Sequence, residues 1–173
     1  MPAADLFPYL RDVPDFPQPG IMFKDITPLL ADPKAFGRAV DGMCEGIKAS
    51  GAQNIIAIES RGFILGSAIA QRLHLPLQLV RKPGKLPRQT RSVSYQLEYG
   101  TDSLEMHDDA VKSSEPCAIV DDVLATGGTA SACARLVSEL GGDIACFSFL
   151  LEISALGGRA ALPPGPAHAL LVS

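Results

Sequence analysis

The chain has 173 residues, of which 47% are hydrophobic and 20% charged, and its formal net charge is −4. This length and composition predict a single globular domain over residues 1–173. The negative charge argues against general nucleic-acid binding, and no apolar run approaches the roughly 20 residues of a membrane-spanning helix.

The N-terminus and the cysteines indicate the compartment. The first eight residues lack the basic and apolar regions of a secretory signal. The cysteines show no C-x-x-C spacing and fall within apolar patterns, which predicts buried thiols in a reducing compartment. They are Cys44, Cys117, Cys133 and Cys146. We therefore expect a cytoplasmic protein without a membrane partner.

In the first half of the chain, proline and glycine mark the boundaries of the elements. Four prolines between residues 8 and 20 predict an extended arm rather than a helix. Asp32-Pro33 predicts the start of a helix that ends at Gly51. The apolar run at 55–58 predicts a strand covered on both faces, residues 63–73 a helix, and residues 77–80 a second strand.

The segment from Arg81 to about Tyr99 breaks this alternation, because it is polar and shows little periodicity. A long insertion of this kind in a compact domain is usually a functional lid or disordered. Five basic residues fall in its first eleven positions without one acidic residue. They are Arg81, Lys82, Lys85, Arg88 and Arg91.

The second half returns to alternating strands and helices. We predict a strand at 117–121, a helix at 127–140, a strand at 144–151 and a last edge strand at 167–172. Repeated strand–loop–helix units are typical of an α/β fold, a mostly parallel twisted sheet with helices on both faces. Ligands of such sheets bind beyond the carboxyl ends of the strands. Residues 59–61, 81–82 and 121–122 all fall at such ends, which predicts a single site.

Residues 118–129 are the most informative part of the chain, Ala-Ile-Val-Asp-Asp-Val-Leu-Ala-Thr-Gly-Gly-Thr. A buried strand leads into two carboxylates and then into a turn of small residues that opens a helix. Backbone N–H groups of such a turn can hold a phosphate at the helix N-terminus. The carboxylates would repel that phosphate, so they suit ribose hydroxyls or a cation. A Walker A loop and a G-x-G-x-x-G fingerprint are both absent here. The plainer alternative is an ordinary turn in which Asp122 only caps the helix.

Residues Cys117 to Thr129 closely resemble the phosphoribosyl-diphosphate (PRPP) signature of the type I phosphoribosyltransferases. Segments 16–29, 59–63, 81–87 and 95–100 are, in that order, similar to the adenine phosphoribosyltransferases. The resemblance implies a purine salvage enzyme that transfers phosphoribose from PRPP to N9 of adenine, giving AMP and pyrophosphate, with Mg²⁺ as cofactor. It also implies a homodimer, an N-terminal arm (residues 1–31) contributing to the base pocket, and a mobile catalytic loop at about 81–103.

The expected site follows from combining the residue chemistry with this resemblance. Charge placed at both ends of the breaking bond would stabilise an electron-poor ribose and an anionic leaving group. We expect the 5′-phosphate at Ala125, Thr126, Gly127, Gly128 and Thr129, the ribose at Asp121 and Asp122, and the pyrophosphate at Arg61, Arg81, Lys82 and Lys85. No protein ligand is assigned to Mg²⁺, which we expect to bind mainly through PRPP.

The base pocket and the acid–base group are implied by the resemblance alone. Met22, Phe23 and Lys24 would line the adenine pocket, with Phe23 stacking on the purine. Phe23 could instead be a core residue beneath the arm. Glu98 is the candidate for acid–base catalysis near N7 of adenine, and Tyr95 and Tyr99 would close the loop over the substrates.

Two other functions stay open from the sequence. One is a different type I transferase, acting on hypoxanthine, guanine, xanthine or orotate, because residues that bind PRPP are shared among these enzymes. The other is a regulator that binds PRPP without catalysis. His74, His107 and His168 are isolated, so we expect no histidine metal site.

Overall fold

The structure, a computed structural model, describes residues 3–96 and 101–173. The N-terminal region begins with a 3-10 helix, η1 (Ala3–Tyr9), followed by two short antiparallel strands, β1 (Arg11–Pro14) and β2 (Met22–Asp25). The predicted extended arm is therefore correct for β1 but wrong for residues 8 and 9, which end η1. Pairing of Val13 with Phe23 turns the arm into a hairpin rather than a free segment.

Two helices follow this hairpin, the short α1 (Thr27–Ala31) and the long α2 (Pro33–Ser50). The predicted boundaries of α2 are confirmed. The Asp32 carboxylate accepts hydrogen bonds from the backbone N–H groups of Lys34 (2.9 Å) and Ala35 (2.8 Å), as an N-cap does. Gly51 ends the helix with a φ of 72°, a conformation that glycine adopts without strain.

The centre of the fold is a five-stranded parallel sheet in the order β4-β3-β7-β8-β9. Its strands are β3 (Asn54–Ile58), β4 (Leu77–Val80), β7 (Pro116–Leu124), β8 (Asp143–Glu152) and β9 (Ala167–Val172). The predicted α/β class, the parallel pairing and the edge position of β9 are confirmed.

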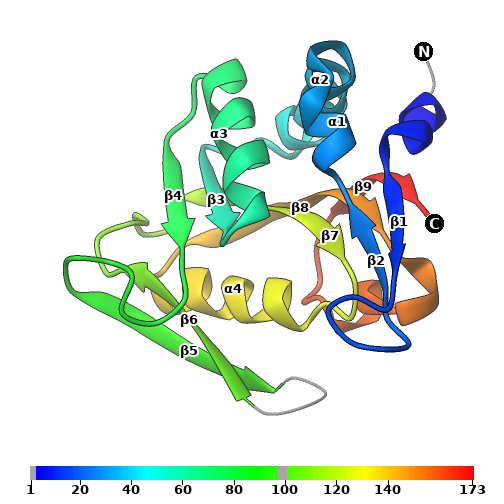
Figure 1. Cartoon of the computed structure of the whole chain (residues 1–173). Helices are drawn as coiled ribbons and strands as arrows, with labels where there is room; N and C mark the ends of the chain where they lie inside the picture. Colours follow the sequence, from blue (N-terminus) through cyan, green and yellow to red (C-terminus); the bar gives the residue numbers. More distant parts are fainter. Residues whose placement is uncertain (1–2, 97–100) are drawn as a thin grey trace.

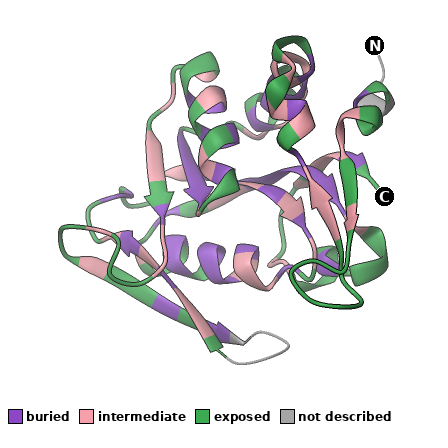
Figure 2. Cartoon of the chain, viewed as in Figure 1, coloured by how far each residue is buried: buried purple, intermediate pink, exposed green. Residues whose placement is uncertain are grey.

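Helices cover both faces of this sheet, as Figure 1 shows. α2 and α3 (Arg61–Leu73) pack on one face, and α4 (Gly128–Glu139) packs on the other. Side chains of β8 alternate between two cores: Phe147 and Phe149 belong to the core with α4, and Cys146 and Leu150 to the core with α2. This double coverage explains the continuously apolar run of β3, which Figure 2 shows as buried.

The segment after β4 differs from our expectation. The sequence predicts either a functional lid or disorder for residues 81–99. Disorder is wrong for residues 90–96, because β5 (Thr90–Gln96) pairs in antiparallel register with β6 (Thr101–His107). Val93, Tyr95, Leu104 and Met106 join the core on the α4 side. Polar residues flank Val93 and Tyr95 on both sides and conceal this alternation. The apolar partners, Leu104 and Met106, lie on β6, beyond residue 99.

The order of the strands in the sheet determines where the site lies. β3 lies between β4 and β7, and the helices that follow β3 and β7 pack on opposite faces. The chain thus reverses its winding direction at the β3–β7 pair, where a crevice opens beyond the carboxyl ends of the strands. Two short 3-10 helices, η2 (Ser154–Leu156) and η3 (Gly158–Ala161), follow β8. No helix in residues 3–96 and 101–173 has the length and apolar character needed to cross a membrane.

Candidate functional site

A cavity of about 380 Å³ opens at this crevice, and many of the residues predicted for the site line it. These residues are Met22, Phe23, Lys24, Arg61, Lys82, Tyr95, Asp121, Asp122, Ala125, Thr126, Gly127 and Thr129. They come from β2, the start of α3, the segment after β4, β5, the end of β7 with the turn that follows it, and the first turn of α4. The parallel sheet therefore brings groups that lie far apart in the sequence around one space.

The turn after β7 has the geometry of an anion site. Gly127 is the N-cap of α4 and has a φ of 82°, and no side-chain cap hydrogen bond is found there among the described residues. The alternative in which Asp122 caps this helix is therefore wrong. A Cβ at position 127 would overlap the carbonyl oxygen of Gly158 and lie 3.0 Å from Cβ of Ala161. The first N–H groups of α4 have no partner within the helix, and Gly127, Thr129 and Ala130 line the cavity at this point.

The two carboxylates lie within β7, which continues to Leu124, three residues beyond the predicted end. Asp122 is only 3% exposed and forms an ion pair with Nε of Arg61. Its backbone N–H donates to Oδ1 of Asp121 at 2.9 Å. Burial, and then the charge of Asp122, raise the pKa of the Asp121 carboxyl well above its ordinary value.

Gly62 brings α3 close to these acids. A Cβ at position 62 would lie 2.9 Å from the carbonyl oxygen of Val120 and 3.0 Å from Oδ1 of Asp121. Glycine is thus required because the first turn of α3 packs directly against the backbone of β7. That contact sets Arg61, the first residue of the helix, beside Asp122.

Two of the predicted pyrophosphate ligands do not line the cavity. Arg81 donates to both carboxylate oxygens of Glu59, at 3.2 and 3.3 Å, and to the carbonyl oxygen of Lys85 at 3.2 Å. Lys85 itself is exposed. Burial by itself would raise the pKa of Glu59, but hydrogen bonds from the Lys82 N–H and the Arg81 guanidinium outweigh it, and the pKa is lowered. Gly128, the first residue of α4, is also absent from the cavity wall.

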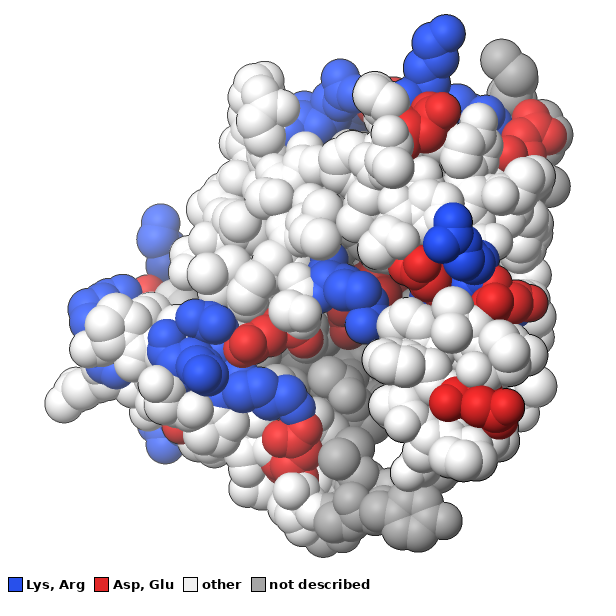
Figure 3. Space-filling view, in the orientation of Figure 1, with Lys and Arg blue, Asp and Glu red and all other residues white. Residues whose placement is uncertain are grey.

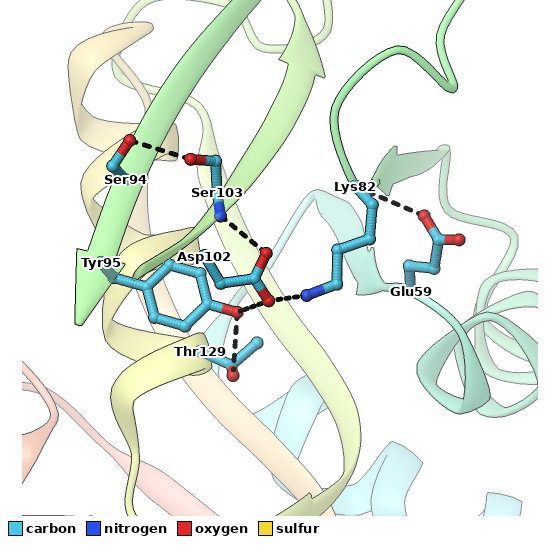
Figure 4. Close-up of polar contacts among 7 residues, drawn as sticks. All are labelled: Glu59, Lys82, Ser94, Tyr95, Asp102, Ser103 and Thr129. Carbon is cyan, nitrogen blue, oxygen red and sulfur yellow. Dashed lines mark hydrogen bonds and ion pairs between the residues drawn. The ribbon is translucent and has the colours of Figure 1, made fainter. Parts of the chain in front are cut away.

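Basic and acidic side chains alternate across this face, as Figure 3 shows. Lys82, like Arg61 and Arg81, is paired with a carboxylate. Its ammonium contacts Asp102, whose Oδ2 also accepts from the Tyr95 hydroxyl at 3.2 Å (Figure 4). The hydrogen bond from Lys82 is the main cause of a lowered pKa for Asp102. Tyr95 is 9% exposed and part of the core, so the loop-closing role assigned to it stays a prediction.

Phe23 lines the cavity and is not a core residue beneath the arm. Its ring centroid lies 5.1 Å from that of Phe16 in an edge-to-face arrangement, and the Arg61 guanidinium carbon lies 5.1 Å from the same centroid. Phe23 is only partly buried and lines the cavity. Lys24 is held by Asp12, since its Nζ lies 2.7 Å from the carboxylate oxygen.

Glu98 and Tyr99 lie outside the described residues, so their assignments stay predictions. Sequence reasoning also missed several lining residues. They are Ile21, Leu104, Val123, Leu124, Ala130, Ile153 and Leu156. Glu59 and Ser60, which the sequence placed at the carboxyl end of β3 without a role, also line the cavity, whereas Ile153 and Leu156 carry no chemical signal. In the described part of the chain, no group of three or more His, Cys, Asp or Glu residues could hold a metal ion.

Comparison with known proteins identifies the family. A family model described as "Phosphoribosyl transferase domain" matches residues 30–152. The adenine phosphoribosyltransferase of Geobacter metallireducens is 54% identical over 162 residues, covering 94% of this chain and 95% of that protein. The crystal structure of adenine phosphoribosyltransferase from Rhodothermus marinus superimposes with a TM-score of 0.94 at 47% identity, covering 99% of this chain and 98% of that one.

A structure with bound ligands shows the same fold. The Saccharomyces cerevisiae adenine phosphoribosyltransferase, complexed with an imino-altritol bisphosphate and adenine, has a TM-score of 0.92 and 34% identity, and 97% of each chain is covered. The parallel sheet, the acid pair before the Gly-Gly turn and these similarities agree. The chain belongs to the type I phosphoribosyltransferase family and, within it, to the adenine phosphoribosyltransferases.

Proposed function

We propose that this protein is the purine salvage enzyme that transfers phosphoribose from PRPP to N9 of adenine, releasing AMP and pyrophosphate. The observation that supports this most directly is the cavity itself. It joins an acid pair, the N-terminus of a helix, the basic side chains of Arg61 and Lys82, and an aromatic ring. These are the groups needed for a ribose, a phosphate, a diphosphate and a purine, respectively.

The ribose and its 5′-phosphate fit the end of β7 and the turn after it. The N–H groups and hydroxyls at 125–129 would bind the phosphate, with the α4 dipole favouring the anion. Asp121 and Asp122 would accept hydrogen bonds from the ribose hydroxyls. Their negative charge would also favour the positively charged sugar that develops as the C1′–oxygen bond breaks.

The leaving group would be held by cations that already lie at the cavity. Arg61 and Lys82 line it directly and can donate to pyrophosphate oxygens. Arg81 and Lys85 would join them only after a change in the 81–85 segment, because Arg81 is paired with Glu59. Adenine would stack on Phe23, with Met22 and Lys24 beside it, and Glu98 would exchange a proton near N7.

Mg²⁺ fits the donor chemistry of this cavity. Carboxylate oxygens of Asp121 and Asp122 are hard ligands of the kind that Mg²⁺ prefers, and the ion usually completes its shell with substrate phosphates and water. When bound, it would neutralise charge on the diphosphate. The residues of the chain that would favour it are this acid pair.

We further propose a cytoplasmic homodimer. All four cysteines are free and buried, which suits a reducing compartment. The edge strand β4 and the adjoining α3 expose Leu79 (38%) and Ile64 (41%), apolar side chains that a second copy could cover. Sedimentation equilibrium would report a monomer if this is wrong.

The function is tested by incubating the protein with PRPP, Mg²⁺ and adenine and measuring AMP by chromatography. Parallel reactions with hypoxanthine, guanine, xanthine and orotate compare kcat/KM among the bases. We expect turnover with adenine and at least about a hundredfold preference for it, which corresponds to ~2.7 kcal/mol. PRPP binding without AMP formation would instead favour a regulator, and preference for another base would overturn the adenine assignment.

A further inference from the structure

Asp102 lies outside the cavity wall yet touches two side chains that form it. It is on β6, directly opposite Tyr95 of β5, and its Oδ2 contacts both the Lys82 ammonium and the Tyr95 hydroxyl (Figure 4). Lys82 and Tyr95 line the cavity, whereas Asp102 is not among its lining residues. Asp102 therefore acts behind the groups that would meet a substrate.

Lys82 is fixed at both ends by carboxylates. Its backbone N–H donates to Oε2 of Glu59 at 2.8 Å, and its ammonium is paired with Asp102. A lysine side chain is long and loses considerable conformational entropy when it is held in one geometry. An ammonium has three donors, so the contact with Asp102 leaves others for an anion in the cavity. The pair thus orders Lys82 without using up its capacity to bind.

The same oxygen of Asp102 connects to the phosphate turn. The Tyr95 hydroxyl donates to it at 3.2 Å, and Oγ1 of Thr129 lies 3.5 Å from that hydroxyl. The backbone N–H of Ser103 donates to the other oxygen, Oδ1, at 2.8 Å, which fixes the carboxylate on β6. Asp102 consequently stands between Lys82 on one side and the first turn of α4 on the other.

We propose that Asp102 is a positioning residue for the diphosphate end of PRPP, acting by holding the Lys82 ammonium at the cavity before the substrate arrives. This inference rests on the proposed function, since it assigns Lys82 to the diphosphate. The opposite possibility is that Asp102 competes with the substrate for Lys82. The two differ in sign: loss of the carboxylate weakens PRPP binding if Asp102 positions Lys82 and strengthens it if Asp102 competes.

The test compares Asp102→Asn with the matched change Asp109→Asn. Asp109 pairs with Arg88 just beyond the ends of the same hairpin, both side chains are more than half exposed, and neither lines the cavity. We expect Asp102→Asn to raise KM and the calorimetric Kd for PRPP about tenfold, ~1.4 kcal/mol. The kcat and the KM for adenine should stay within about twofold of the wild-type values. Asp109→Asn should match the wild type.

A double-mutant cycle tests whether Asp102 acts through Lys82. Lys82→Ala should weaken PRPP binding, and adding Asp102→Asn to it should cause no further loss. Asp102→Glu, which retains the charge, should bind PRPP more tightly than Asp102→Asn does. Melting temperatures of all variants show whether folding is retained, and Asp102→Ser takes the place of Asp102→Asn in every comparison if Asp102→Asn unfolds.

Several results would overturn the inference. The first is that Asp102→Asn binds PRPP more tightly than the wild type. The second is that Asp102→Asn and Asp109→Asn bind PRPP with the same affinity. The third is that Asp102→Asn weakens PRPP binding in the Lys82→Ala background as much as it does in the wild type. The proposed function fails separately, when the wild-type protein forms no AMP. PRPP calorimetry still reports on Asp102 in that case, because it requires no turnover.

Discussion

Replacing Gly127 by alanine should destabilise the fold and weaken PRPP binding. The loss of stability has a conformational part and a steric part. A φ of 82° is unfavourable for any residue with a Cβ, at a cost of about 1–2 kcal/mol. The new methyl group would also overlap the carbonyl oxygen of Gly158 and lie 3.0 Å from Cβ of Ala161. Backbone cannot move as cheaply as a flexible side chain, so overpacking adds about 1–3 kcal/mol. Together the two parts should lower the free energy of unfolding by about 2–5 kcal/mol.

Gly51→Ala is the matched control. Gly51 has a φ of 72°, and an added Cβ there meets no heavy atom within 4 Å in the described part of the chain. It should therefore lose only the conformational part, about 1–2 kcal/mol, in urea denaturation. Gly127→Ala should in addition raise the KM for PRPP tenfold or more, ~1.4 kcal/mol, because the turn must shift. Equal stability and equal KM for the two variants would refute the steric argument.

Three further predictions concern titratable side chains. Glu98→Gln should lower turnover while PRPP binding stays nearly intact, and unchanged kcat would remove Glu98 from the mechanism. Asp121→Asn should raise the melting temperature yet weaken PRPP binding. Because burial raises the pKa of Asp121, ionisation of its carboxyl destabilises the folded protein as pH rises. The stabilisation by Asp121→Asn should therefore be larger at about pH 8 than at about pH 4, and the reverse trend would contradict this reasoning. Burial raises the pKa of the Cys117 thiol to about 12, so a thiol reagent should leave the native protein unlabelled at neutral pH and react only after denaturation; rapid labelling of the native protein would contradict this burial.

Local features of the sequence were sufficient for much of the fold. The boundaries of α2 follow from Asp32 and Gly51, whose roles depend only on neighbouring backbone groups. The apolar run of β3 predicted a strand covered on both faces, and alternation with helices predicted the parallel sheet. Because parallel strands share one carboxyl edge, the sequence also predicted that Arg61 and Asp122 would lie near one another.

Pairing between distant segments was not readable in this way. The hairpin of β5 and β6 depends on Tyr95 and Leu104 packing against α4, a contact that local periodicity does not encode. Which cations face the cavity was likewise decided by tertiary partners: Arg81 pairs with Glu59 and does not line the cavity, whereas Lys82 lines it and pairs with Asp102. The sequence by itself determined the chemistry available to this protein, because residue types and short-range spacing set it. The tertiary structure decided which of those groups meet, because partner choice depends on strand order and register.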